Sequence, residues 1–496
     1  MKSISFKNRY IKLGKEFAVK TKPEPVKNPQ LIKFNQQLAE ELGLSETALN
    51  PANTLSESTA IFAGNLNPDG AEPVAMAYAG HQFGQFNPQL GDGRAILLGE
   101  IITPSGAHVD MQLKGSGQTC FSRNGDGRAA LGPVLREYLL SEAMAKLGVP
   151  TTRALAAVSS GEEVARQQLL PGGIITRMAS SFIRVGTFQY FSSRENISAI
   201  KKLADFVIER NYPTVKSEPD SYCLLLKLIV ERQAALLAQW MQIGFIHGVM
   251  NTDNMSIAAE TIDYGPCAFM DHFNHQQVYS SIDRNGRYAY HNQPSIGLWN
   301  LTRLAESLLP LLAGTSDLAV KQAENILNDY ADLYQQSWLA GMREKLGLST
   351  KRNNDRELIE ELLNIMHQNR ADFTLSFYYL SQLFISFTEQ DRLLHSLFKD
   401  VEAIKDWLLK WRKRLNQEPV RDEVRQAKMQ SVNPVYIPRN HLIEAAIRAA
   451  EDAADFTPFH DLYDVLQKPF ELQAGKEKYR LVPKPNEVVE HTFCGT

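Results

Sequence analysis

The pattern of hydrophobic and polar positions predicts a strand-rich segment over residues 75–113. Glycine and turn residues divide this segment into short pieces, one of which is the apolar run at 95–98. Residues 108–113 alternate between polar and apolar, which is the period of a strand with one buried face. A proline, a serine and a glycine at 104–106 separate the two pieces and predict a tight turn. We therefore expect an antiparallel sheet in this part of the chain.

Helical patterns follow the predicted sheet. Pro133 is suited to the first turn of a helix, and Gly148 with Pro150 ends it, which gives a helix of about fifteen residues. A longer helix is predicted over 221–243, ending at Gly244. From residue 295 the pattern is mostly helical, and we expect helices over 301–312, 318–346, 357–366 and 442–454.

The first 60 residues predict an arm or brace rather than a domain. Prolines at positions 23, 25 and 29 mark an extended segment, which leads into a helix expected over 29–44. We find no internal repeat and no low-complexity tract along the sequence.

Composition narrows the class of protein. The 496 residues are 44% hydrophobic and 22% charged, which suits a globular chain with two or three lobes. The net charge of −3 provides no general basic field, so we expect no nucleic acid partner. Four cysteines without a C-x-x-C pair favour a reducing compartment over a disulfide scaffold or a cysteine-rich zinc site.

The sequence carries no strong targeting or membrane signal. Its basic N-terminus lacks the apolar core of a signal peptide, and the richest apolar stretch, residues 223–241, contains Lys227, Glu231 and Arg232. We therefore expect a cytoplasmic protein without a membrane segment. Walker P-loop, H-E-x-x-H and G-x-S-x-G motifs are absent from the sequence, so the chemistries that use them have no support.

The segment HGVMNTDN at 247–254, followed by DYG at 263–265, is similar to the catalytic loop and metal-binding triplet of a protein kinase. In protein kinases this loop has the sequence H-R-D-x-x-x-x-N. Its Asp takes the proton from the hydroxyl group of the substrate, and its Asn binds a metal ion. His247, Asn254 and Asp263 fall in register with that pattern, but Val249 stands where the base belongs. A carboxylate lies instead at Asp253. A chain with these ligands and a displaced base predicts a nucleotide site with altered transfer chemistry.

The order of the other parts is also that of a kinase. The turn QLGDGR at 89–94 lets backbone N–H groups approach phosphate, and Lys114 ends the next predicted strand. Glu137 shares a helix face with apolar residues such as Val134 and Leu140, so it needs a partner. We predict a Lys114–Glu137 ion pair that holds the lysine toward phosphate. Each feature also has a simpler interpretation when taken singly. The glycine segment fits an ordinary turn, Lys114 fits a solvated strand end, and Glu137 fits a partly exposed acid on a helix.

Several longer blocks carry a more specific resemblance. These blocks are YAGHQFG at 78–84, LKGSG at 113–117, SRNGDGRA at 122–129, HGVMNTDN with DYG, and VNPVYIPRN at 432–440. In these blocks, and over nearly its whole length, the chain resembles the SelO (YdiU) family of protein nucleotidyltransferases. The resemblance implies a pseudokinase fold that binds ATP in a flipped orientation and transfers AMP to hydroxyl side chains of proteins, with UMP transfer from UTP also proposed in the family.

The resemblance also implies roles for single residues. Asp253 would be the general base and Asn254 with Asp263 would hold Mg²⁺ or Mn²⁺, for which hard oxygen ligands are suited. Without the resemblance, Asp253 reads as a capping acid, and Arg177 and Arg184 read as ordinary surface arginines. The implied nucleotide contacts are Gly91, Gly93, Arg94, Lys114, Asp126, Gly127, Arg177, Arg184 and Asp263, with Glu137 as the partner of the lysine.

Cys494 lies third from the C-terminus, where some members of that family carry selenocysteine. Cys267 lies four residues beyond Asp263 and could meet Cys494 if the tail folds back over the site. The two thiols are thus candidates for a redox latch, and two unrelated free thiols are the competing interpretation.

These observations predict an α+β chain with a protein-kinase-like two-lobed fold. We expect an N-terminal extension (1–60), an N-lobe (61–170), a C-lobe (171–330) and a helical C-terminal region (331–496). Protein AMP transfer is the favoured function, and a phosphotransferase that passes the γ-phosphate to a protein or small molecule is the alternative. A non-catalytic nucleotide-binding scaffold is a third class. Val249 argues against the phosphotransferase. The presence of Lys114, Glu137, Asn254 and Asp263 argues against the non-catalytic scaffold.

Overall fold

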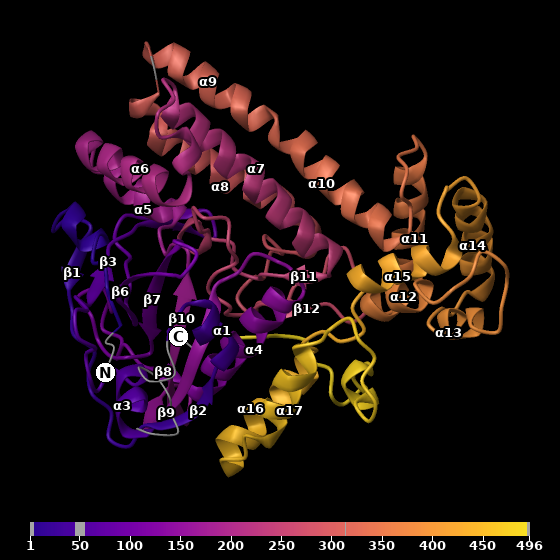
Figure 1. The fold of residues 1–496 in the computed structure, drawn as a ribbon, viewed down its shortest axis with the longest axis horizontal. Coiled ribbons are helices and arrows are strands. Elements are labelled where there is room, and N and C mark those ends of the chain that lie inside the picture. The colour runs from indigo at the N-terminus through magenta and orange to yellow at the C-terminus, as the bar shows by residue number, and fades with distance from the viewer. Residues whose placement is uncertain (1–3, 45–54, 313, 494–496) are drawn as a thin grey trace.

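One antiparallel sheet dominates the first part of the computed structural model, which describes residues 4–44, 55–312 and 314–493. Figure 1 shows the sheet on one side of a layer of long helices, with a further group of helices at the far end. Along the sheet the strand order is β1 (Ala18–Lys20), β3 (Val74–Met76), β6 (Ala95–Ile102), β7 (His108–Lys114), β10 (Leu169–Ala179), β9 (Arg153–Ala165) and β2 (Gln30–Phe34), with β8 (Ala129–Ala130) paired to β10.

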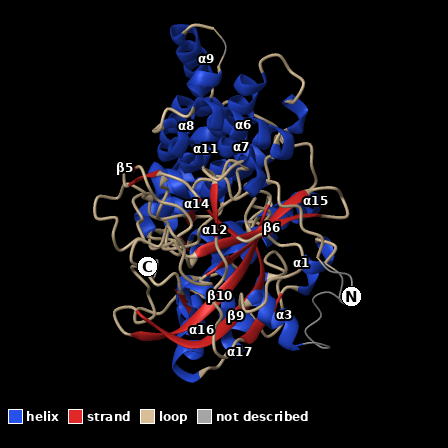
Figure 2. Ribbon diagram, turned by 90° about the vertical axis from the view of Figure 1, so that its left-hand side faces the viewer, coloured by secondary structure: helices blue, strands red, loops and turns tan. Residues whose placement is uncertain are grey.

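The predicted strand-rich segment is confirmed. Strands β6 and β7 form a hairpin in which Ala95 lies opposite Lys114, and the chain turns between Thr103 and Ala107. A second, two-stranded hairpin, β4 (Gly80–Gln82) with β5 (Gln85–Asn87), leaves the main sheet. Figure 2 shows β5 beside the helical layer rather than along the sheet.

The N-terminal segment differs from its prediction. Residues 30–34, expected to begin a helix, form strand β2, and helix α1 covers Gln36–Glu41 alone. Strand β9 exposes an edge of unpaired backbone groups, and pairing of Leu31 with Val158 satisfies that edge. Asn35 then caps α1 by accepting a hydrogen bond from the Leu38 N–H. Since β1 pairs with β3 at the other side, the N-terminal residues form both edges of the sheet.

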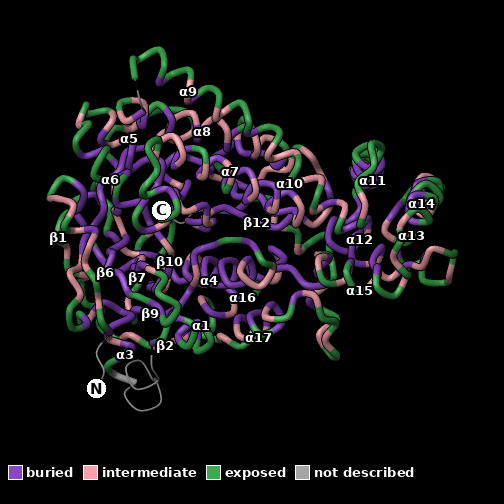
Figure 3. Tube along the Cα trace, turned by 45° about the horizontal axis from the view of Figure 1, so that its top comes forward, coloured by how far each residue is buried: buried purple, intermediate pink, exposed green. Residues whose placement is uncertain are grey.

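A helix is present where the Pro133 and Gly148 signals predicted one: α4 (Leu131–Lys146), which packs against β9 and β10 of the sheet. The helical layer contains α5 (Val185–Ser192), α6 (Ile197–Asn211), α7 (Ser221–Gln242), α8 (Gln293–Leu308), α9 (Ser316–Asn328) and α10 (Tyr330–Lys345). Figure 3 shows α4 and β10 largely buried between layers, whereas α9 is exposed along its outer side. A short helix, α3 (Leu55–Phe62), lies against β9 and β10.

The single helix predicted over 318–346 is two helices. The break is at Asp329, and Asn328 and Asp329 are both weak helix formers. Tyr330 begins the second helix with a buried side chain, whose hydroxyl donates to the carbonyl oxygen of Pro294. This contact ties the start of α10 to the start of α8. The other predicted late helices are present as α8, α11 and α16.

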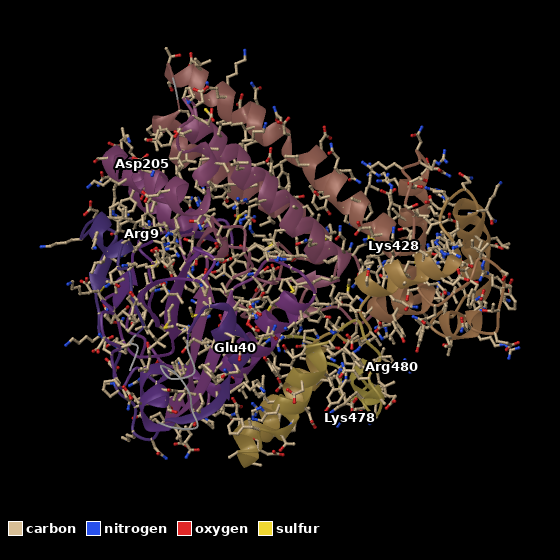
Figure 4. All side chains as sticks on the ribbon, viewed as in Figure 1. Arg9, Glu40, Asp205, Lys428, Lys478 and Arg480 are labelled. Carbon is tan, nitrogen blue, oxygen red and sulfur yellow. The ribbon has the colours of Figure 1, made fainter. Side chains whose placement is uncertain are left out.

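The C-terminal half adds a separate group of helices and then returns to the sheet. The group comprises α11 (Asp355–Asn369), α12 (Phe373–Leu380), α13 (Asp391–His395), α14 (Val401–Leu415) and α15 (Asp422–Val432) around stacked Trp407 and Trp411. Helices α16 (Asn440–Ala453) and α17 (Thr457–Leu466) pack on α4, with Tyr138 between Phe459 and Tyr463. Figure 4 labels Lys428 on the helical group and Lys478 and Arg480 on the segment after α17. Among the described residues, no helix is long and apolar enough to span a membrane.

A buried ion pair joins the two ends of this arrangement. Arg439, fully buried before α16, contacts Asp271 and lies 2.8 Å from Asp372 at the start of α12. Asp271, which had no predicted role, therefore helps to hold the C-terminal region against the segment that follows the DYG triplet.

We predict that Arg439→Ala lowers the free energy of unfolding by about 3–5 kcal/mol, because it leaves buried carboxylates without a partner. Urea unfolding followed by circular dichroism measures the change. The matched control is Arg356→Ala, which removes an exposed pair with Glu360 and should cost less than about 1 kcal/mol. Equal losses in the two variants would contradict a structural role for the buried pair.

Candidate active site

A cleft of about 920 Å³ lies between the sheet and the loop at 247–254. It is open on one side and is lined by strand ends, helix α4 and the loop. The sequence-predicted nucleotide, proton-transfer and metal residues all line this cleft: Gly91, Gly93, Arg94, Lys114, Asp126, Gly127, Glu137, Arg177, Arg184, Asp253, Asn254 and Asp263. The fold thus brings together residues that are up to 172 positions apart in the sequence (263 − 91).

Two glycines in the lining of the cleft, Gly91 and Gly127, are required for steric reasons. Gly91 has φ 113°, and a Cβ there would lie 2.4 Å from the Phe121 ring. Gly127 has φ 65°, and a Cβ there would lie 2.0 Å from the carbonyl oxygen of Gly117. Both positions therefore require glycine for backbone shape and for space. Asp126, before Gly127, is ion-paired with Arg166 at 2.7 Å.

The expected ion pair is present at the floor of the cleft. Lys114 Nζ lies 2.7 Å from Glu137 Oε2 and 3.2 Å from Asp263 Oδ1. Arg177 Nη1 contacts the same two acids, at 2.9 Å from Glu137 and 2.7 Å from Asp263. Arg184 Nη1 completes the group at 2.9 Å from Asp263 Oδ2. We call these five residues, three cations and two carboxylates, the floor cluster. A further acid, Asp92, lies 3.9 Å from Arg184 Nη2.

The two arginines of the floor cluster are not surface residues. Arg177 is 1% exposed and Arg184 is 3% exposed, which corrects the reading that their types alone suggest. Arg177 lies on β10 opposite Gln112 of β7, and its Nη2 contacts the Gln112 side chain. Although burial alone would lower the pKa of Arg184, Asp263 and Tyr78 raise that pKa above its ordinary value. Buried guanidinium groups held this way are fixed donors for an anion.

Asp263 is the centre of the floor cluster. Its φ of 58° is unusual for a residue with a side chain and lets the carboxylate face the cleft. Burial alone would raise the pKa of Asp263, but Arg184, Lys114 and Arg177 hold it well below its ordinary range. The carboxylate is therefore ionised at neutral pH.

Asp253 lies in a different environment, on the short 3₁₀ turn Thr252–Asn254. It is 6% exposed, and burial raises its pKa to about 6. Gln82 donates a hydrogen bond to Oδ2 at 3.2 Å, while Oδ1 accepts none within the described residues. A Cβ on Gly80 would lie 2.4 Å from Oδ1, so the β4–β5 hairpin leaves just enough room for this oxygen. A carboxyl group with a pKa of about 6 and one oxygen that lacks a hydrogen-bond partner is suited to accept a proton.

Asn254 and Asp263 supply oxygens that suit a divalent cation. The Asn254 side-chain amide donates to the carbonyl oxygen of Val249 at 3.0 Å, which turns its own oxygen away from that contact. The described residues contain no group of three or more His, Cys, Asp or Glu side chains that could hold a metal. Two protein oxygens together with substrate phosphates are nevertheless the usual set for Mg²⁺. The residues present therefore fit a cation that arrives with a nucleotide.

His247 anchors the loop rather than lining the cleft. Its ring nitrogen Nε2 lies 2.8 Å from the carbonyl oxygen of Ile262, and its backbone N–H donates to the Gln293 side chain. The sequence predicted no role for Gln82, Gln112 or Asn251. Gln82 contacts Asp253 and Gln112 contacts Arg177, whereas Asn251, within the loop, accepts a hydrogen bond from the Phe83 N–H. Gln82 lies within the YAGHQFG block, which was the available signal.

Cys267 and Cys494 are not brought together by the described residues, because Cys494 lies outside them. Cys267 is buried beside the cleft, next to Pro266, which lines it. The Thr492 hydroxyl donates to the carbonyl oxygen of Pro266 at 2.6 Å. The tail therefore reaches the residue next to Cys267.

The chain is similar to known protein nucleotidyltransferases over its whole length. Residues 1–467 match the family model described as protein adenylyltransferase SelO. Over 496 residues, covering all of both chains, the sequence is 54% identical to protein nucleotidyltransferase YdiU of Rhizobium meliloti (strain 1021). It is 55% identical over 491 residues, 99% of each chain, to protein nucleotidyltransferase YdiU of Rhodopseudomonas palustris (strain BisB5).

The geometry of Gly127 predicts that Gly127→Ala weakens ATP binding at least about tenfold, since a Cβ adds strain of about 1–3 kcal/mol and displaces the loop. Isothermal titration calorimetry measures the change. Gly125→Ala is the matched control in the same loop, because its nearest neighbour, the Ser122 carbonyl oxygen, lies 3.0 Å away and its φ is not positive. Similar affinities for the two variants would overturn the steric argument.

Proposed function

This chain belongs to the SelO family of protein adenylyltransferases, and we propose that it transfers AMP from ATP to the hydroxyl groups of Ser, Thr or Tyr in other proteins. Family membership makes it an enzyme, a protein nucleotidyltransferase. The observation that carries the finer proposal is the floor cluster, in which Lys114, Arg177 and Arg184 gather around the Asp263 carboxylate. Arg184 also donates a hydrogen bond to the backbone carbonyl oxygen of Asp253 at 2.9 Å, so the cluster is joined to the loop that carries the proposed base.

The cluster supports a nucleotide bound in the flipped orientation. The three cations suit the terminal phosphates of ATP, which carry most of its negative charge. In the proposed orientation the γ-phosphate is held by these side chains, of which Arg177 and Arg184 are buried, and the α-phosphorus is the atom presented to the acceptor. We therefore propose that the α-phosphorus is attacked and that pyrophosphate is the leaving group.

Asp253 is the proposed general base. Its free Oδ1 accepts the proton of the incoming hydroxyl while that oxygen attacks the α-phosphorus. A new P–O bond forms to the acceptor, the bond from the α-phosphorus to the bridging oxygen breaks, and the electron pair leaves with pyrophosphate. Val249, which also lines the cleft, has no group able to do this at the position where kinases place their base.

We propose that Asn254 and Asp263 hold Mg²⁺ or Mn²⁺ with the nucleotide. The cation would neutralise charge on the polyphosphate. The chain's own part is to keep Asp263 ionised and the Asn254 oxygen available, which the floor cluster and the Val249 contact support.

The proposal includes a protein-kinase-like arrangement of two lobes. Lys114 on a strand, Glu137 on a helix and the loop at 247–254 share one cleft in the order that kinases use. We propose lobes over 61–170 and 171–330, an N-terminal extension over 1–60 and a helical C-terminal region over 331–496. Strand β10 spans the boundary between the two lobes.

Labelled ATP distinguishes AMP transfer from phosphate transfer. Purified protein is incubated with a dialysed cell lysate and Mg²⁺ or Mn²⁺, with the label either in the α- or in the γ-phosphate. We expect protein-bound label from α-labelled ATP alone, with release of pyrophosphate. Label from γ-labelled ATP would instead support the phosphotransferase alternative. α-Labelled UTP in the same assay tests UMP transfer.

The pH dependence of the reaction tests Asp253. The base must be ionised, and burial raises its pKa to about 6, so the transfer rate should fall about tenfold per pH unit below pH 6 and level off above it. Asp253→Asn should lower the rate by about 10²–10⁴-fold at pH 7.5 with little change in the affinity for ATP. An unchanged rate in that variant would remove Asp253 from the mechanism.

We also propose that Cys267 and Cys494 form a redox latch, supported by the contact of Thr492 with Pro266. The transfer rate should rise on treatment with reductant in the wild-type protein and be insensitive to it in Cys494→Ser. Identical responses of the two proteins to reductant would exclude the latch.

A further inference from the structure

A basic and aromatic surface borders the cleft on the side of Asp253. It comprises residues of the β4–β5 hairpin, of the loop before α8 and of α8 itself. We call it the Arg287 surface, and its members are Phe83, Phe86, Ile282, Arg287, Trp299 and Arg303.

The Arg287 surface is continuous with the cleft and fixed to the loop that carries Asp253. Phe83 and Ile282 both line the cleft. The Phe83 N–H donates to Asn251 Oδ1 at 3.1 Å, and the Tyr288 hydroxyl donates to the same oxygen at 2.7 Å. The β4–β5 hairpin and the loop before α8 therefore both hydrogen-bond to the side chain of Asn251, which lies two residues before the proposed base, Asp253. A molecule that presents a hydroxyl to Asp253 from the open side would meet them.

The two arginines of this surface differ in their ion-pair partners. Arg287 and Arg303 stack on Trp299, with guanidinium carbons 4.9 and 5.1 Å from the ring centre. Arg303 pairs with Glu306 at 2.8 Å, but Arg287 has no carboxylate within ion-pair distance among the described residues.

The carboxylate nearest to Arg287 in the sequence, that of Asp283, binds backbone N–H groups and not the guanidinium group. Asp283 is 6% exposed and accepts the backbone N–H groups of Arg287 and Tyr288. Burial, followed by Arg303 and Arg287, lowers the pKa of His81, which is consistent with a positive potential at this place. The Arg287 fork is thus oriented by stacking and available to an anionic group.

Apolar side chains accompany this charge. Ile282 is 65% exposed and Phe86 is 40% exposed, both at the open side. Large exposed apolar residues beside an oriented arginine are typical of protein-binding surfaces. Gly84, at the hairpin turn, lies close to the Arg287 guanidinium, since a Cβ there would be in van der Waals contact with it at 3.5 Å.

We propose that the Arg287 surface binds the acceptor protein and selects hydroxyl side chains that have Asp or Glu within a few residues. This inference rests on the proposed AMP transfer to protein hydroxyls and names the substrate class that the same site favours. The acidic side chain would pair with Arg287, and an apolar neighbour would cover Ile282 or Phe86. The acceptor hydroxyl would then be held toward Asp253.

The test uses the full-length protein, α-labelled ATP and the proteins of a dialysed cell lysate, with modified sites located by mass spectrometry. Wild-type sites should be enriched in Asp and Glu within four residues of the modified hydroxyl. Arg287→Glu should lose that enrichment and label the wild-type sites at least about tenfold more slowly, which corresponds to the loss of one charge pair of about 1.4 kcal/mol. Arg287→Lys, which keeps the charge, should retain the acidic preference.

Controls separate this inference from folding and from the proposed function. Arg232→Glu reverses an arginine that stacks on Tyr212, outside the residues that line the cleft, and should label as the wild type does. ATP affinity, measured by calorimetry, should be equal in all the variants. Labelling without acidic enrichment, or equal labelling by Arg287→Glu, would overturn the docking surface and leave AMP transfer intact. No protein labelling by the wild type would overturn the proposed function itself.

Discussion

The ionised carboxylate of Asp263 is the constraint on which the site depends. Three cations from different parts of the chain lie within 3.2 Å of it, and two of them are almost fully buried. Buried cations require carboxylate partners, so Asp263 and Glu137 together allow Lys114, Arg177 and Arg184 to remain in the lining of the cleft. In the proposed function, a nucleotide with its divalent cation would replace these contacts with equivalent ones, since phosphate would pair with the cations and the metal with the carboxylate.

The rest of the fold supports this arrangement. The sheet places Lys114 and Arg177 on paired strands, and α4 brings Glu137 across from them. Helices α16 and α17 hold α4 from its other side through Tyr138, while Arg439 ties the start of α16 to the segment after the DYG triplet. The C-terminal region, whose role the sequence does not state, thus supports both the helix and the loop that carry the two floor-cluster acids.

Local patterns predicted much of this fold, and long-range pairing decided the remainder. The β6–β7 hairpin and helices α4 and α7 were foreseen because their periodicity and end signals are local. Residues 30–34 were not, because strand β2 exists through pairing with β9 more than 120 positions away. The burial of Arg177 depends on Glu137 and Asp263, which no window of sequence contains. Gln82 was missed for the same reason, as its partner Asp253 lies 171 positions away.

The central claim is that the floor cluster holds the terminal phosphates of ATP rather than its α-phosphate. Calorimetric affinities of ATP and AMP for the wild-type protein and for Lys114→Met test it most directly, because AMP lacks those phosphates. We expect the variant to bind ATP at least about tenfold more weakly and AMP with unchanged affinity. Equal losses for ATP and AMP would place the lysine on the α-phosphate and contradict the flipped orientation.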